Sequence, residues 1–482
     1  MRRNCRTYFT FALPLFLAAC AQMAPRTFQP EASPSAWQAP LPNLPHQGQL
    51  SGLRQWWQQW DDATLVTLIE AAQTAGPTLD AARARLDQAQ ASLQMAQAVL
   101  GPATDVSLSS NRGRQTTIMG TPIATVTQAR VGATWETDLF GQSQLLRDAA
   151  SLRVQGAQAA WHEARVSLAA DVANLYLAQR ACELTLAFQR EDIESRAVTA
   201  RLTQAQADAG FATASSAKLA RSAESESHAR LRQQLAICDT GVKGLVALTG
   251  LTEPELRRQL AASRQSTTQS LALAVETIPA KALTQRPDVF QAERQVAAAS
   301  AELGSAQAER YPRLTLNGAV GQMNLRLGGS NIDLSTWSVG PITLSVPLWD
   351  NGRFAAHVAE SSARYDEAAA NYRAKARQAV REVEEALVQL HSARERLADL
   401  QSASEGYRAL LNSVQQRQQH GLASVGELEE TRRSVLAAQA ALVGQQRDTQ
   451  QAWVALYRAV GGGWSPDTLA VPAQSTAKVT AP

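Results

Sequence analysis

The sequence predicts an internally duplicated α+β membrane protein, in which each half supplies strand segments and a long helical hairpin. Three observations predict this fold class. The first is a repeat, because Pro77 to Pro102 and Pro287 to Pro312 have the same spacing at an offset of 210 residues. The second is a long proline-free helical stretch in each half, and the third is an alternation of apolar and polar residues before each stretch. A single period of about half the chain indicates two equivalent halves rather than a solenoid of short repeats.

The N-terminal segment is typical of a secreted lipoprotein. Three arginines precede a short apolar run that ends in Leu17-Ala18-Ala19-Cys20. This pattern predicts a signal peptide over residues 1–19 and a lipid on Cys20, the alternative being a signal peptide with an incidental cysteine. The alanine after Cys20 resembles that of lipoproteins sorted to the outer membrane. Residues 20–50 are rich in Pro, Gln and Ser, so we expect an extended tether.

Charge and composition give no support to an enzyme. Removal of the signal leaves 43 basic and 43 acidic residues, a balance that does not favour nucleic acid as a partner. The six histidines are scattered without metal-ligand spacing, and the sequence has no Ser/His/Asp arrangement or phosphate-binding glycine loop. We therefore expect no catalysis, no metal and no cofactor.

Two cysteines remain in the mature chain besides Cys20. Cys182 and Cys238 lie 28 residues before and 28 residues after Gly210, so an antiparallel helix pair would bring them to the same height. An oxidising periplasm permits a disulfide there, but the rotation of each helix must also match. A disulfide and two buried thiols are both compatible with the sequence.

The helical stretches are long enough to be rods. Residues 142–209 and 353–420 each comprise 68 positions rich in Ala, Gln, Arg, Glu and Leu, which makes rods of about 100 Å at 1.5 Å per residue. Gly210 and Gly421 interrupt the pattern before it resumes, so each stretch is predicted to be a helical hairpin. An ordinary coiled coil is the alternative. Two equivalent hairpins attached to strand segments favour a wider helical tube.

Strand segments precede both hairpins, from Ala103 to Gly141 and from Arg313 to Gly352. Apolar and polar residues alternate along 128–136, and a returning strand is expected from Trp337 to Leu348 after a Gly/Asn-rich loop. Four aromatic residues are expected near strand ends, as in a membrane-interface girdle: Trp135, Phe140, Trp337 and Trp349. The edge of a soluble β-sandwich would also alternate. No apolar run after the signal is long enough for a spanning helix, so a membrane crossing would require strands.

The number of strands indicates an oligomer. Two β-hairpins give four strands per chain, whereas closed outer-membrane barrels begin at about eight strands. One chain therefore cannot close a barrel. A trimer would share a 12-strand outer-membrane β-barrel, and its long helical hairpins would form a periplasmic α-barrel.

Several motifs carry a resemblance to a known family. They are Trp56-Trp57 with Asp61-Asp62 and Leu68-Ile69, the run from Trp135 to Gly141, Arg286-Pro287-Asp288-Val289 with Ala292-Glu293, Tyr311-Pro312-Arg313-Leu314, and Val339-Gly340-Pro341 running to Pro347-Leu348-Trp349. With these motifs the chain resembles the TolC-like outer membrane factors, specifically the lipidated branch of tripartite efflux systems. The resemblance implies a homotrimer that passively exports small molecules and contacts a periplasmic adaptor and an inner-membrane pump.

Two other functions stay open at this level. A protein secretion duct would have the same fold, although lipidation favours small-molecule efflux. An oligomeric periplasmic scaffold lipoprotein would explain the rods but not the alternating strands.

The turns of the two rods are the candidate adaptor-contact sites, because a turn at the far end of a rod has nothing of its own to pack on. These residues are Gly210, Phe211, Ala212 and Thr213, and Gly421, Leu422, Ala423 and Ser424. The resemblance places a gate near the same end, with Tyr407, Arg417 and Glu427 as candidates whose alternative is a solvated helix face. Ala423 departs from a frequent gate Asp of the family, whereas Arg433 matches its usual arginine.

The predicted organisation follows the two halves along the chain. It comprises a signal peptide (1–19), a tether (20–50), first-half equatorial helices (51–101), a first β-hairpin (102–141), a first long helical hairpin (142–252), a linker or equatorial segment (253–286), a second-half equatorial helix (287–311), a second β-hairpin (312–350), a second long helical hairpin (351–463) and a C-terminal tail (464–482).

Overall fold

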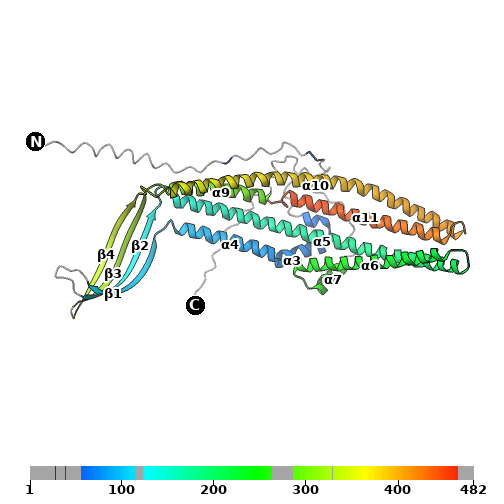
Figure 1. Ribbon diagram of the computed structural model, residues 1–482, viewed down its shortest axis with the longest axis horizontal. Coiled ribbons are helices and arrows are strands. Elements are labelled where there is room, and N and C mark those ends of the chain that lie inside the picture. The colour runs from blue at the N-terminus through cyan, green and yellow to red at the C-terminus, as the bar shows by residue number, and fades with distance from the viewer. Residues whose placement is uncertain are drawn as a thin grey trace. The chain divides into compact units, whose positions relative to one another are not determined.

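The computed structural model describes residues 28, 38–39, 56–114, 123–262, 286–327 and 329–464 of the 482-residue chain. The predicted signal peptide, the predicted lipidation site at Cys20 and most of the predicted tether and C-terminal tail lie outside the described residues. The elements divide into two units, and each unit is described by itself. Figure 1 labels the elements along the chain.

The first unit contains an antiparallel sheet built from both halves of the chain. Its strands are β1 (Ala103–Arg114), β2 (Ile123–Thr137), β3 (Arg313–Leu327) and β4 (Ser330–Ser345), and this is also their spatial order (Figure 1). Strands β2 and β3 join the two halves over 14 paired positions. The four predicted strands are thus confirmed among the residues that the structure describes.

Strand β4 begins earlier than the sequence predicts. The expected start at Trp337 is wrong, because the chain turns at Gly329, which has φ +93°, and pairs with β3 from Ser330 onward. The polar residues interpreted as a loop belong to the sheet, where the Asn324 side chain donates to Asp333 at 2.7 Å. Trp337 therefore lies in the middle of β4 opposite Val320, and its expected place near a strand end is also wrong.

Helices of equal length repeat in the two halves. Helices α4 (Pro77–Ala98) and α9 (Pro287–Ala308) have 22 residues each, and α5 (Gln142–Asp208) and α10 (Arg353–Gln419) have 67 residues each. Both long helices start directly after a glycine with positive φ, Gly141 at +78° and Gly352 at +88°. The returning helices α6 (Ala214–Thr249) and α11 (Val425–Ala459) complete the two hairpins. The internal duplication predicted from the proline spacing is therefore confirmed.

The second unit is held together by one large apolar core, to which η1 (Trp56–Trp60), α3 (Ala63–Ala75), α7 (Glu253–Ala262) and the four hairpin helices contribute. Trp56 is 1% exposed and stacks on Tyr457 with ring centroids 4.6 Å apart. Asp62 caps α3 by accepting from the first N–H groups of that helix, and it also accepts a 2.6 Å hydrogen bond from the Tyr176 hydroxyl. The Trp and Asp motif of the first half thus serves the packing of this unit.

The described helices differ from membrane-spanning helices in length or hydropathy. Among the described helices, none is both long and apolar enough to cross a membrane on its own. Helices α6 and α7 meet that criterion only when they are taken together, and they are bent by 110° at the break between them.

Candidate functional site

The first long hairpin turns through a left-handed glycine. Gly210 has φ +80°, its N–H donates to the Ala207 carbonyl at 3.1 Å, and the Phe211 N–H donates to the Gln206 carbonyl at 2.8 Å. This pair of bonds is the Schellman helix end, which requires a residue that tolerates positive φ. Thr213 then caps α6, since its hydroxyl accepts from the backbone N–H three residues later at 3.1 Å.

The second long hairpin repeats the same motif. Gly421 has φ +73°, its N–H donates to the Gln418 carbonyl at 2.9 Å, and the Leu422 N–H donates to the Arg417 carbonyl at 2.7 Å. Ser424 caps α11 through a 3.0 Å bond from the N–H three residues later. Both turns therefore have one backbone geometry, and the eight predicted contact residues lie at the two hairpin ends.

Each turn presents one apolar side chain to solvent. The residue after the glycine in a Schellman end often packs on the preceding helical turn. Here Phe211 is 88% exposed and Leu422 is 71% exposed. The two side chains occupy the same position of the same motif, so the hairpin ends offer a matched pair of apolar contacts.

The gate candidates are brought together only in part. Arg417 Nη1 lies 2.9 Å from Glu427 Oε1, and the guanidinium also donates to the Leu422 carbonyl at 3.3 Å. Both charged side chains are partly exposed, so the pair braces the turn from the solvent side. Tyr407 lies ten residues before Arg417 in α10 and is 43% exposed. Ala423 supplies no charge at the turn.

Arg433 makes a polar contact between the two hairpins of the second unit. Its guanidinium donates to the hydroxyls of Ser195 and Thr199 in α5 at 3.3 and 3.1 Å, and it also pairs with Glu430. The Ser195 hydroxyl in turn donates to the Glu429 carbonyl of α11 at 3.3 Å. The sequence identifies this arginine only as a family match, because Ser195 and Thr199 are more than 230 residues away.

The two remaining cysteines are bonded in the structure. Cys182 in α5 and Cys238 in α6 form a disulfide with Cα atoms 5.7 Å apart, and both residues are 6% exposed. Leu186 and Leu231 pack around the bond. The equal spacing of the two cysteines about Gly210 thus places them at the same height on the two helices. Of the two alternatives that the sequence left open, a disulfide and two buried thiols, the structure has the disulfide.

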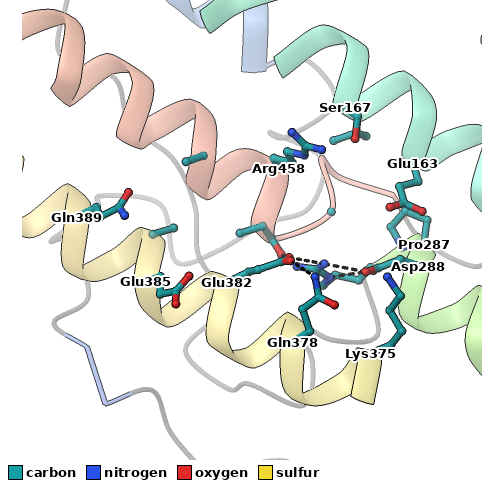
Figure 2. A pocket seen from close by; sticks show the side chains of 16 residues that line it. Glu163, Ser167, Pro287, Asp288, Lys375, Gln378, Glu382, Glu385, Gln389 and Arg458 are labelled. Atoms are coloured by element: carbon teal, nitrogen blue, oxygen red, sulfur yellow. Dashed lines mark hydrogen bonds and ion pairs between the residues drawn. The ribbon is translucent and has the colours of Figure 1, made fainter. Parts of the chain in front are cut away.

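A charged cluster closes the start of α9. Arg286 donates to both carboxylate oxygens of Asp288 at 2.9 and 2.8 Å, to the Ala459 carbonyl at 2.7 Å and to Glu382 at 2.7 Å (Figure 2). Burial tends to raise the pKa of Asp288, but the hydrogen bonds and charge of Arg286 outweigh it, so this pKa lies below its ordinary value. The helix start predicted at Pro287 is confirmed, whereas the contact with Glu382, 96 residues away, had no local signal.

A cavity of about 360 Å³ adjoins this cluster, and Figure 2 shows its side chains. Glu163 and Lys375 line it together with the Arg286 group. Burial and the neighbouring charge of Asp288 raise the pKa of Glu163 above its ordinary value. In the part of the chain that the structure describes, no group of three or more His, Cys, Asp and Glu side chains could hold a metal ion. The hydrogen bonds of Arg286 to Asp288, Glu382 and Ala459 link the start of α9 to α10 and to the last residue of α11.

Two neighbouring rows of the sheet in the first unit, which lie on opposite faces, differ in polarity. Val106, Val131, Val320 and Trp337 are direct neighbours across the four strands, and they are 80%, 47%, 59% and 78% exposed. The next row, on the other face, consists of Ser107, Arg130, Gly321 and Thr336. Within the described chain, β1 and β4 are the outer strands of the sheet. One chain thus presents an exposed apolar row across its four strands and two strand edges that can pair with further strands.

Comparison with known proteins covers both halves of the chain. The sequence model of the outer membrane efflux protein family matches residues 68–251 and 278–462. The outer membrane protein OprJ of Pseudomonas aeruginosa is 28% identical over 96% of this chain and 97% of its own length. The solvent efflux pump outer membrane protein SrpC of Pseudomonas putida is 26% identical over 84% of this chain and 86% of its own. Among solved structures, the Campylobacter jejuni CmeC outer membrane channel has a TM-score of 0.79 and 21% identity, covering 92% of this chain and 96% of that one.

Proposed function

We propose that this chain, which belongs to the outer membrane efflux protein family, is the exit duct of a tripartite pump that expels small molecules. It is an outer-membrane efflux channel, as its relatives are. The observation that carries the proposal is the four-stranded sheet with an exposed apolar row and two strand edges. Such a sheet suits a lipid-facing wall, and it is too narrow to close on itself.

A homotrimer is the proposed working unit. Three copies would supply twelve strands, enough for one closed barrel, and edges β1 and β4 of neighbouring copies would pair. The helical hairpins of the three copies would then form the periplasmic part of the duct. We propose no catalytic role for the chain, and the energy for export would come from the inner-membrane pump.

The two hairpin ends are the proposed contact with the periplasmic adaptor. Phe211 and Leu422 support this assignment, because each is an exposed apolar side chain in a rigid turn. Arg417 and Glu427 are proposed to belong to the gate at the same end, together with Tyr407. The names of the relatives favour small molecules as cargo, since SrpC is described as part of a solvent efflux pump.

Cys20 is the proposed lipid attachment site. The sheet would itself anchor the protein in the membrane, so Cys20→Ala is expected to remove the lipid and leave part of the efflux activity. Complete loss of membrane association in this variant would contradict the membrane role of the sheet.

The native mass of the detergent-extracted protein tests the assembly. Three chains per particle are expected. A monomer would leave four strands unable to close and would favour the scaffold lipoprotein. Deletion of the gene, followed by dye accumulation and an inventory of secreted proteins, tests the cargo. Increased dye accumulation with unchanged secretion is expected, and the reverse result would favour a protein secretion duct.

A further inference from the structure

The segment that the sequence predicts as an extended tether has a specific contact in the second unit. Glu384 of α10 accepts from two consecutive backbone amides, the Gln38 N–H on Oε1 and the Ala39 N–H on Oε2, both at 2.7 Å. Hydrogen bonds to an ionised carboxylate are shorter and roughly twice as strong as neutral ones. Ala39 is 8% exposed and belongs to the large apolar core. This point of the segment is therefore held by both polar and apolar contacts.

A second contact of the same segment lies in the first unit. The Phe28 ring meets Tyr372 of α10 edge to face, with centroids 5.0 Å apart and planes at 83°. Both rings pack against a small cluster formed by Val296, Ala299 and Tyr365. Tyr372 and Glu384 are twelve residues apart on the same helix. Both described parts of the N-terminal segment thus contact α10.

We propose that α10 carries a docking site for the chain's own N-terminal segment, and that Glu384 is its anchor. Glu384 binds backbone amides, so this contact does not depend on which side chains residues 38 and 39 carry. The two carboxylate oxygens each accept from one amide, so the contact requires two consecutive N–H groups that face α10. Phe28 makes a separate apolar contact with Tyr372 of the same helix.

The anchor limits how far a lipid on Cys20 can lie from the helical body, a consequence that rests on the proposed lipidation. Gln38 lies 18 positions after Cys20 in the sequence. A fully extended chain spans at most about 3.4 Å per residue, so the lipid would lie within about 60 Å of Glu384. The docked segment is thus a strap of fixed maximum length.

Hydrogen exchange of the purified full-length protein tests the anchor directly. In the wild type the amides of Gln38 and Ala39 are expected to be protected. Glu384→Gln removes the charge and one acceptor oxygen, so exchange at these amides should accelerate about tenfold or more, as the loss of a charge-assisted bond allows. Glu385→Gln is the matched control, because the neighbouring Glu385 is exposed and its partner is Arg381, 3.8 Å away. Equal exchange in both variants would overturn the proposal.

A change on the segment side keeps the test independent of α10. Gln38→Pro deletes the N–H that Glu384 Oε1 accepts and leaves the helix unaltered. Faster exchange at Ala39 and faster proteolysis between residues 20 and 50 are expected, and unchanged values would also overturn the anchor. These readouts need neither efflux nor a trimer. A monomeric particle with a protected segment would refute the exit duct and leave the strap standing, whereas a trimer with an unprotected segment would do the opposite.

Discussion

The two long hairpins share their backbone geometry but are braced differently. In the first hairpin, Cys182 and Cys238 are joined by a disulfide 28 residues from the turn glycine on either side. The positions at the same distances in the second hairpin are Ala393 and Thr449. There the Thr449 hydroxyl donates to the Ala393 carbonyl at 3.3 Å, and the Gln445 amide donates to the same carbonyl at 3.0 Å. One hairpin thus has a covalent brace at the level where the other has hydrogen bonds.

The turns of the two hairpins also differ, in the charge of their side chains. Arg417 and Glu427 pair across the second turn, whereas the matching positions of the first turn hold the uncharged Gln206 and Ser216. Both turns nevertheless keep the left-handed glycine and the hydroxyl cap. The comparison teaches that the two halves retained the features that define the backbone path, while the side chains that brace or gate each hairpin changed independently.

The largest effect is expected from breaking the turn motif itself. Gly421→Val places a β-branched residue at φ +73°, which costs on the order of 1–3 kcal/mol of local strain. No atom lies within 4 Å of the added Cβ, so the cost is conformational and not steric. We expect efflux to be abolished in a dye-export assay while the protein still reaches the outer membrane.

Two matched variants sharpen this test. Gly210→Val makes the same change in the first turn, and Gly406→Ala changes a glycine inside α10 whose added Cβ would also meet open space. Gly406→Ala should preserve efflux and stabilise the helix by about 0.5–1 kcal/mol. Full efflux by Gly421→Val would refute the assignment of the hairpin ends to partner contact. A loss confined to one of the two turn variants would show that a single hairpin carries that contact.

The second effect separates the covalent brace from the hydrogen-bonded one. Cys182 and Cys238 close a loop with a sequence separation of 56, and the chain-entropy model assigns about 4 kcal/mol to such a bond. Thr449→Ala removes one hydrogen bond, worth about 1 kcal/mol. The double variant Cys182→Ala/Cys238→Ala should therefore accelerate hydrogen exchange in α5 and α6 far more than Thr449→Ala does in α10 and α11. Similar acceleration in both hairpins would show that the disulfide contributes little beyond an ordinary contact.

An engineered bond provides the converse test of that comparison. Ala393→Cys/Thr449→Cys should form a disulfide in the second hairpin, detected as a mobility shift that a reducing agent reverses. Failure to form the bond in an oxidising compartment would show that the two braced levels differ in helix rotation despite equal distances from the turn.

Local signals explain which parts of the fold could be predicted. Proline spacing, turn glycines and helix-forming composition placed the rods within one residue at their C-terminal ends, because such features act over a few neighbouring positions. The start of β4 was missed, since Asn331 and Asp333 resemble loop residues although an exposed sheet face accepts polar side chains. The contacts of Arg286 with Glu382 and of Arg433 with Ser195 were missed because these partners are distant in sequence. The hairpin ends follow from the sequence pattern alone, whereas the Arg417–Glu427 pair depends on how the two helices meet across the turn.

The third effect concerns the starts of α4 and α9, where the halves differ again. At the start of α4, a Cβ added to Gly76 would approach the Ala72 carbonyl oxygen to 2.5 Å. The residue 210 positions later, at the start of α9, is Arg286, which lies in a buried ion cluster beside Glu163. The pKa of Glu163 is raised, so its ionised form is disfavoured in the folded state. The Glu163 carboxyl contributes to stability below its ordinary pKa, where it is protonated. This contribution is lost as the pH rises through the pKa of the folded state. Glu163→Gln should therefore raise the thermal midpoint at pH 7 and lose this advantage below about pH 4.

A paired variant checks the sign of that pH dependence. The pKa of Asp288 is lowered, so its ionised form supports folding above its ordinary pKa, and that support is lost as the pH falls through the folded value. Asp288→Asn should therefore lower the thermal midpoint at pH 7. A fall in the midpoint for Glu163→Gln as well would show that the cavity carboxylate is stabilising, contrary to the argument from burial.

The smallest effect on stability is expected at the charged turn. Arg417 and Glu427 are partly exposed, and exposed ion pairs contribute roughly 0.2–1 kcal/mol. A double-mutant cycle with Arg417→Gln and Glu427→Gln should give a coupling free energy in that range, and it should shrink at high salt because mobile ions screen exposed charges. Efflux is the more informative readout, because a gate contact would change dye export by more than the small change in stability accounts for. Placing the same pair in the first turn, as Gln206→Arg/Ser216→Glu, should leave export unchanged if only the second hairpin gates the channel. Equal changes in export from both turns would remove the functional difference between the hairpins and leave the pair as a brace of its own turn.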